Sequence, residues 1–179
     1  MRDATVKSRV LTKIIFMKYV NFCLAVVASL TLMSGSVNKS TPSVGYYPGE
    51  AIPNIVVEDL EGNAINLDDL KGKKVVLNFW AAYDAQSRAT NVQLYNYLKM
   101  NNSDVEFLSV SFDKNRNVFE KTLLLDNIDS FSHFCDVNGT ESEIYKDFQL
   151  RKGFKSYLID ETGVITAMNV TPETLRTLL

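Results

Sequence analysis

The sequence has few residues of the kinds that redox catalysis and metal binding most often use. Its 179 residues include two cysteines and one histidine, His133. Cys23 lies in an N-terminal segment that we expect to be removed, so the processed chain keeps only Cys135. One thiol cannot form an intramolecular disulfide, and one histidine without clustered cysteines does not make a metal site. The sequence therefore predicts no cofactor and no metal.

A long apolar run is also missing. The most apolar stretch, Phe22–Met33, is shorter than the roughly 20 residues that a membrane-spanning helix needs. Basic residues precede it, and the small residues Ser34–Ser36 follow it, which is the order of a secretory signal. We predict that residues 1–36 are a signal peptide; an uncleaved anchor is the alternative and would be the chain's only contact with a membrane. Met17 is an alternative start site.

Positive charge is scarce beyond this leader. The formal charge of −2 divides into +4 for residues 1–36 and −6 for the remainder. An acidic body gives no electrostatic footprint for nucleic acid, so that class of partner is excluded. The Ser/Thr/Pro/Gly-rich stretch 37–47 is predicted to be a linker. An apolar share of 46% supports one core, which we place in a single domain at residues 48–179.

The most informative stretch is residues 75–98. Residues 75–80 form an almost continuous apolar run, typical of a strand that is buried on both faces. Asp84 stands where a helix N-cap belongs, and a helical pattern continues to Leu98. A central strand is therefore predicted to lead directly into a long helix, with Tyr83, Asp84 and Ser87 in or just after the turn.

The other expected elements complete a three-layer α/β domain. We predict hairpins at 55–67 and 156–167, a second buried strand at 105–112, and a loop at 128–138. Further helices are predicted after Asp113, after a capping box at residues 140–143, and after Thr171–Pro172.

Residues 79–88 read F-W-A-A-Y-D-A-Q-S-R, which resembles the F-W-A-x-W-C-x-x-C-R phrase of the thioredoxin-like family. The resemblance is strongest to its TlpA-type envelope members and the related AhpC/TSA, or redoxin, group. A second phrase, Y-L-I-D-E-T-G-V-I at residues 157–165, resembles the family's C-terminal hairpin. The resemblance covers about residues 45–179 and implies a thioredoxin-like fold with an N-terminal hairpin. It also implies thiol–disulfide oxidoreductase activity and export to the periplasm or cell envelope of a bacterium.

This chain departs from the family at three positions. Asp84 stands at the first cysteine, Ser87 at the second, and Phe154 where the resemblance places a cis-proline. A carboxylate cannot carry out thiol exchange, but as an N-cap it accepts the same N–H groups that would stabilise a thiolate. A non-proline cis bond costs about 3 kcal/mol, so we expect a trans peptide at Phe154. The site is predicted to be degenerate.

The residues support two functional hypotheses and, less strongly, a third. In the first, the former active site is a binding groove for a peptide or an envelope protein, and the chain is a non-enzymatic accessory module. The groove would be made by Trp80, Tyr83, Asp84, Ser87, Arg88 and Phe154, although ordinary core packing is the alternative for its aromatic residues.

The second hypothesis is a thiol oxidoreductase or antioxidant protein that works through Cys135. His133 would lower the pKa of this thiol if the two side chains met, whereas a free cysteine is more often a small packed residue. The third and least favoured hypothesis is a hydrolase with Ser87 as nucleophile, for which His133 is the only histidine available as a base.

Overall fold

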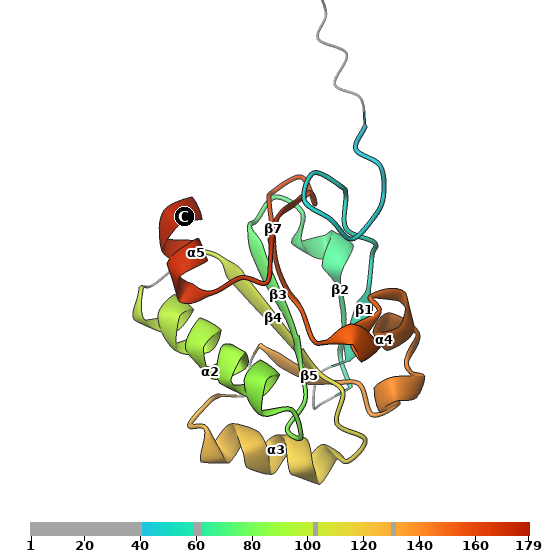
Figure 1. Cartoon of the computed structure of the whole chain (residues 1–179), viewed down its shortest axis with the longest axis vertical. Coiled ribbons are helices and arrows are strands. Elements are labelled where there is room, and N and C mark those ends of the chain that lie inside the picture. The colour runs from blue at the N-terminus through green and yellow to red at the C-terminus, as the bar shows by residue number, and fades with distance from the viewer. Residues whose placement is uncertain (1–40, 59–61, 102–103, 130–131) are drawn as a thin grey trace, which may run out of the picture. The chain divides into compact units, whose positions relative to one another are not determined.

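The computed structural model describes residues 41–58, 62–101, 104–129 and 132–179 (Figure 1). The predicted signal peptide therefore lies outside the described residues. Residues Pro42–Leu179 form one compact unit. Five strands make its main sheet, in the order β5-β4-β3-β6-β7, and a separate pair of strands, β1 and β2, forms a hairpin.

The central strand is the predicted one. Strand β3 (Val75–Trp80) is buried along its whole length, with β4 (Glu106–Ser111) parallel to it on one side. On its other side β6 (Ser156–Ile159) runs antiparallel and pairs in turn with β7 (Ile165–Met168). The sheet is therefore mixed, with a parallel half and a hairpin half.

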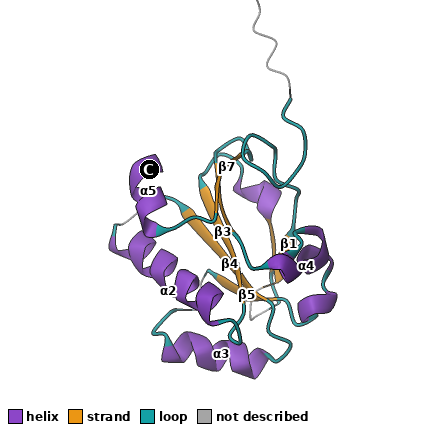
Figure 2. Cartoon of the chain, viewed as in Figure 1, coloured by secondary structure: helices purple, strands orange, loops and turns teal. Residues whose placement is uncertain are grey.

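Alternating side chains of β3 point to the two faces of the sheet. Val75, Leu77 and Phe79 enter the larger core, which is covered by the β1 (Val56–Glu58)–β2 (Ala64–Asn66) hairpin and α4 (Glu143–Asp147). Val76 and Trp80 enter two clusters on the opposite face. That face is covered by α2 (Ala85–Met100), α3 (Arg116–Leu125) and α5 (Pro172–Leu178), as Figure 2 shows. The expected three-layer α/β architecture is confirmed.

Short 3₁₀ turns complete the unit. They are η1 (Leu67–Leu70) after the hairpin, η2 (Gly139–Glu141) before α4, and η3 (Leu150–Lys152) before β6. The chain before the hairpin is also attached to the domain: the N–H of Gly45 donates to the carbonyl of Ala51, and the ring of Tyr46 packs edge-on against Phe148. Two residues of the stretch 37–47, which composition predicted to be a linker, therefore contact the domain.

Local predictions failed where polar side chains had more than one available partner. Asn115, not Asp113, caps α3, and Ser142 caps α4 in place of the capping box predicted at Thr140. The stretch predicted to be a loop contains a short edge strand, β5 (His133–Cys135), parallel to β4. Three residues are too few to show a clear period of two in a sequence.

Candidate functional site

The turn between β3 and α2 is built around Asp84. This residue has an extended backbone, and its carboxylate Oδ1 accepts a hydrogen bond of 2.8 Å from the backbone N–H of Ser87. The carboxylate therefore satisfies one of the N–H groups that the first turn of a helix leaves without an internal partner. The predicted N-cap is confirmed, and the carboxylate of Asp84 accepts the hydrogen bond at the start of α2.

Ser87 is turned inward rather than toward solvent. It is 7% exposed, and its hydroxyl donates to the carbonyl oxygen of Asp84 at 3.2 Å while lying 3.4 Å from the N–H of Ala81. His133, the base that a serine nucleophile would need, packs between the rings of Tyr95 and Phe107 on the helical face. The structure does not bring Ser87 and His133 together, so it gives no support to a hydrolase.

Asp113 holds the same turn from the end of β4, a role that the sequence did not reveal. Its side chain is almost fully buried, and Oδ2 accepts from the N–H of Ala82 at 2.9 Å and from the hydroxyl of Ser111 at 2.7 Å. In the sequence, the only signal of this role is an acidic residue directly after a buried strand. The same signal is equally typical of a helix N-cap. The turn is fixed by two carboxylates, one local and one from a neighbouring strand.

A groove of about 560 Å³ lies beside the turn. Its walls come from the start of α2, from the segment before β6, and from the segment before α5. The lining residues are Asn78, Phe79, Asp84, Gln86, Ser87, Thr90, Lys152, Gly153, Phe154, Lys155, Ser156, Asn169, Val170 and Thr171. Three residues predicted for the groove therefore line it: Asp84, Ser87 and Phe154.

The other three residues predicted for the groove, Trp80, Tyr83 and Arg88, do not line it. Trp80 is completely buried and packs against Phe119 on the helical face, which is the core-packing alternative. Arg88 reaches away to Asp126, which it contacts through Nε at 2.7 Å and Nη2 at 2.5 Å. Tyr83 is 65% exposed beside the groove, with its ring centroid 6.3 Å from that of Phe154.

Phe154 is half-buried, and the described residues contain no cis peptide bond. The trans peptide expected at this position is thus present. The Phe154 ring stacks on Phe112 and meets Tyr145 edge-on. An aromatic cluster therefore anchors the loop where the family resemblance places a proline.

Cys135 is half-buried at the end of β5, and its thiol contacts the carbonyl oxygen of Asp113 at 3.4 Å. Burial, together with the negative charges of Asp113 and Asp136, raises the pKa of this thiol to about 12. A reactive cysteine needs the opposite, a thiolate stabilised by cations or a helix N-terminus. Cys135 is also not among the residues that line the groove.

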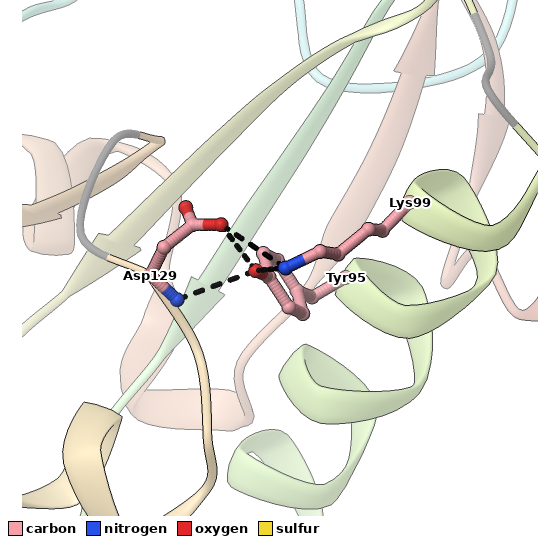
Figure 3. Close-up of polar contacts among 3 residues, drawn as sticks. All are labelled: Tyr95, Lys99 and Asp129. Carbon is pink, nitrogen blue, oxygen red and sulfur yellow. Dashed lines mark hydrogen bonds and ion pairs between the residues drawn. The ribbon is translucent and has the colours of Figure 1, made fainter.

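His133 is fully buried two residues before Cys135 in β5, on the same face of the sheet, and burial lowers its pKa to about 4. Next to it, the hydroxyl of Tyr95 contacts the carboxylate of Asp129, and the ammonium of Lys99 donates to Tyr95 at 2.7 Å (Figure 3). These contacts tie the segment after α3 to α2. A neutral imidazole at ordinary pH cannot supply the charge that would activate Cys135.

Among the described residues there is no group of three or more side chains able to hold a metal ion. Within the same part of the chain, no helix is long and apolar enough to cross a membrane.

The scaffold matches a known protein family. The AhpC/TSA family matches residues 48–168. The chain belongs to the AhpC/TSA family. The match covers the hairpin, the central strand, the altered turn and both strands of the C-terminal hairpin, so the resemblance carried by residues 79–88 and 157–165 is confirmed.

Individual relatives give the same assignment. The chain is 31% identical over 147 residues to thiol-disulfide oxidoreductase ResA of Bacillus cereus, covering 78% of this chain and 82% of that one. It is 28% identical over 137 residues to thioredoxin-like protein YneN of Bacillus subtilis, covering 73% and 76%.

Among solved structures, a thioredoxin-like protein from Parabacteroides distasonis superposes with a TM-score of 0.65 and 40% identity. This superposition covers 76% of this chain and 96% of that one. The fold is thioredoxin-like, and the family is one of thiol–disulfide oxidoreductases.

Proposed function

We propose that this AhpC/TSA member is an exported protein without thiol–disulfide redox activity, and that it binds a peptide or protein partner through the groove beside Asp84. The observation that carries the proposal is the 2.8 Å hydrogen bond from the Ser87 N–H to the Asp84 carboxylate. The helix N-terminus that activates a thiol in this fold is occupied by a group that cannot attack sulfur.

The position of the remaining thiol supports the same proposal. Cys135 is half-buried outside the groove, and its raised pKa leaves very little thiolate at neutral pH. Thiol–disulfide exchange requires the thiolate, and a lone cysteine has no partner to resolve a mixed disulfide. Burial and local negative charge both oppose catalysis at this residue.

The groove itself remains suited to an extended ligand. It combines the half-buried ring of Phe154 with amide and hydroxyl groups from Gln86, Thr90 and Asn169. A concave surface of this mixed character fits a peptide that presents both side chains and backbone groups. The exposed ring of Tyr83 adds an aromatic contact beside it.

Family membership favours the second candidate, an oxidoreductase or antioxidant protein that uses Cys135. One experiment separates the two functions: the purified protein is given insulin with dithiothreitol and, separately, hydrogen peroxide. We expect neither insulin reduction nor peroxide consumption above the rate without protein. Turnover that disappears in Cys135→Ser would establish the oxidoreductase and refute the binding module.

A further inference from the structure

The groove is continued by a second hollow of about 660 Å³, formed by α4 and the turn η3. Lys152 lines both hollows, so they adjoin at this side chain. Lys146 and Arg151 also line the second hollow, and Lys155 lines the groove. Four cationic side chains therefore follow one another along a surface that begins beside Asp84.

Three of these cations have no carboxylate partner among the described residues. Lys152 contacts the side-chain oxygen of Gln149 at 2.7 Å, and Lys155 donates to the backbone carbonyl of Phe148 at 3.0 Å. Arg151 is exposed and enters none of the ion pairs of the described residues, whereas Lys146 pairs with Glu141. We call Arg151, Lys152 and Lys155 the basic triad.

The carboxylates near these cations are already engaged. Asp84, the one acidic residue among those that line the groove, caps α2 through Ser87. Glu141, the one acidic residue among those that line the second hollow, lies 3.7 Å from Lys146. Among the described residues the basic triad thus has no ion-pair partner, on a body whose net formal charge is −6 outside residues 1–36.

The cations also act on one another. Burial lowers the pKa of Lys155, and the nearby charge of Lys152 lowers it further. Two like charges that are held close together without a counterion are relieved when an anion binds between them. An anion bound where the two hollows adjoin would therefore interact favourably with both ammonium groups.

We propose that the partner segment bound by this surface is an extended acidic peptide, with its carboxylates on the basic triad and its remaining side chains in the groove. This inference rests on the proposed function and adds the chemical class of the ligand. Charge complementarity selects the acidic class, because the triad attracts carboxylates whereas the rest of the acidic body repels them. Two hollows in series suit an extended chain rather than a single small anion.

The test uses the purified full chain and a fluorescently labelled octapeptide of alternating glutamate and valine. Matched octapeptides carry glutamine or lysine in place of glutamate. Anisotropy titrations at low salt should show the acidic peptide binding at least tenfold more tightly than the glutamine peptide. The difference should shrink on addition of ~150 mM salt, because screening weakens contacts between exposed charges.

Two charge-matched double variants locate the effect. Arg151→Gln with Lys152→Gln should weaken acidic-peptide binding about tenfold, as expected for the loss of two exposed charge contacts. Lys73→Gln with Lys121→Gln removes the same net charge from exposed sites outside both hollows and should leave the affinity within about twofold. Backbone amide shifts should move at Gly153 and Thr171 when the acidic peptide binds.

Three results would overturn the inference: equal binding of the acidic and glutamine peptides, equal weakening by the two double variants, or no binding of the acidic peptide. Equal binding of both peptides with amide shifts in the groove would leave the binding module intact and remove only its preference for acids. Failure of the proposed function is a separate observation, namely catalytic reduction of insulin by the wild-type protein.

Discussion

The backbone N–H of Ser87 donates a 2.8 Å hydrogen bond to the carboxylate of Asp84. The two residues stand at the helix N-terminus, where the resemblance to the thioredoxin-like family places a pair of cysteines. Both Asp84 and Ser87 stabilise the turn. Asp84 caps the helix, and the buried hydroxyl of Ser87 donates to the carbonyl oxygen of Asp84. The exchange of sulfur for oxygen therefore preserves the start of the helix while it removes the reactive group.

Asp84→Ala should destabilise the protein by about 1 kcal/mol, the ordinary cost of losing a side-chain N-cap. Asp84→Asn keeps an oxygen acceptor and should change the free energy of unfolding by only a few tenths of that amount. Urea denaturation of the three proteins checks this. An alanine variant as stable as the wild type would show that the carboxylate does not act as a cap.

Asp113→Ala should cost about 1 to 3 kcal/mol, because it leaves the N–H of Ala82 and the hydroxyl of Ser111 without their buried acceptor. Asp113→Asn retains one acceptor oxygen and should cost less. Denaturation gives the energies, and the amide shifts of Ala82 and Tyr83 report whether the turn moves. Unchanged shifts in the alanine variant would contradict a positioning role for Asp113.

Cys135 should behave as an unreactive thiol. Since burial raises its pKa to about 12, the rate of alkylation by iodoacetamide should be far below that of a free cysteine at pH 8. The rate should still be rising with pH at pH 10, without a plateau. A plateau near neutral pH would mean that an activated thiolate exists and would favour the oxidoreductase.

The fully buried His133 makes stability depend on acidity. Its pKa is about 4 in the folded protein against an ordinary value of 6.5, so the unfolded chain takes up the proton first as the pH falls. Above pH 6.5 the titration of His133 does not change the free energy of unfolding. Between pH 6.5 and 4 it lowers that free energy by about 3 kcal/mol in total.

His133→Phe keeps the edge-on contacts with Tyr95 and Phe107 but cannot be protonated. Urea denaturation at pH 7, 5.5 and 4.5 should therefore show a smaller loss for the variant than for the wild type. Parallel curves for the two proteins would show that His133 does not titrate abnormally.

The main helices and strands could be predicted from the sequence because their patterns are strong. The unbroken apolar run at β3, the capping position of Asp84 and the Thr171–Pro172 helix start each have one physical explanation. The groove was only partly predictable. Phe154 lines the groove, but Trp80 and Arg88 do not. Adjacent strand residues face opposite sides of a sheet, and Trp80 faces the helices. Arg88 instead donates to the carboxylate of Asp126.

Contacts between distant segments could not be predicted from the sequence. Asp113 had two possible partners, its own helix and the turn of a neighbouring strand, and only the fold brings Ala82 within hydrogen-bond distance. The basic triad needed the same information. Nothing in the sequence marks Arg151, Lys152 and Lys155, and only the fold places them along the two hollows.

The most direct measurement compares the wild-type protein with Asp84→Cys/Ser87→Cys in the insulin and dithiothreitol assay, both in a Cys135→Ser background and without it. The two positions lie one helical turn apart and their atoms already touch, so the paired cysteines should form a reversible disulfide. The account predicts that the double-cysteine variant reduces insulin catalytically in both backgrounds, whereas the wild type does not. Catalytic reduction by the wild type, lost on Cys135→Ser, would contradict it.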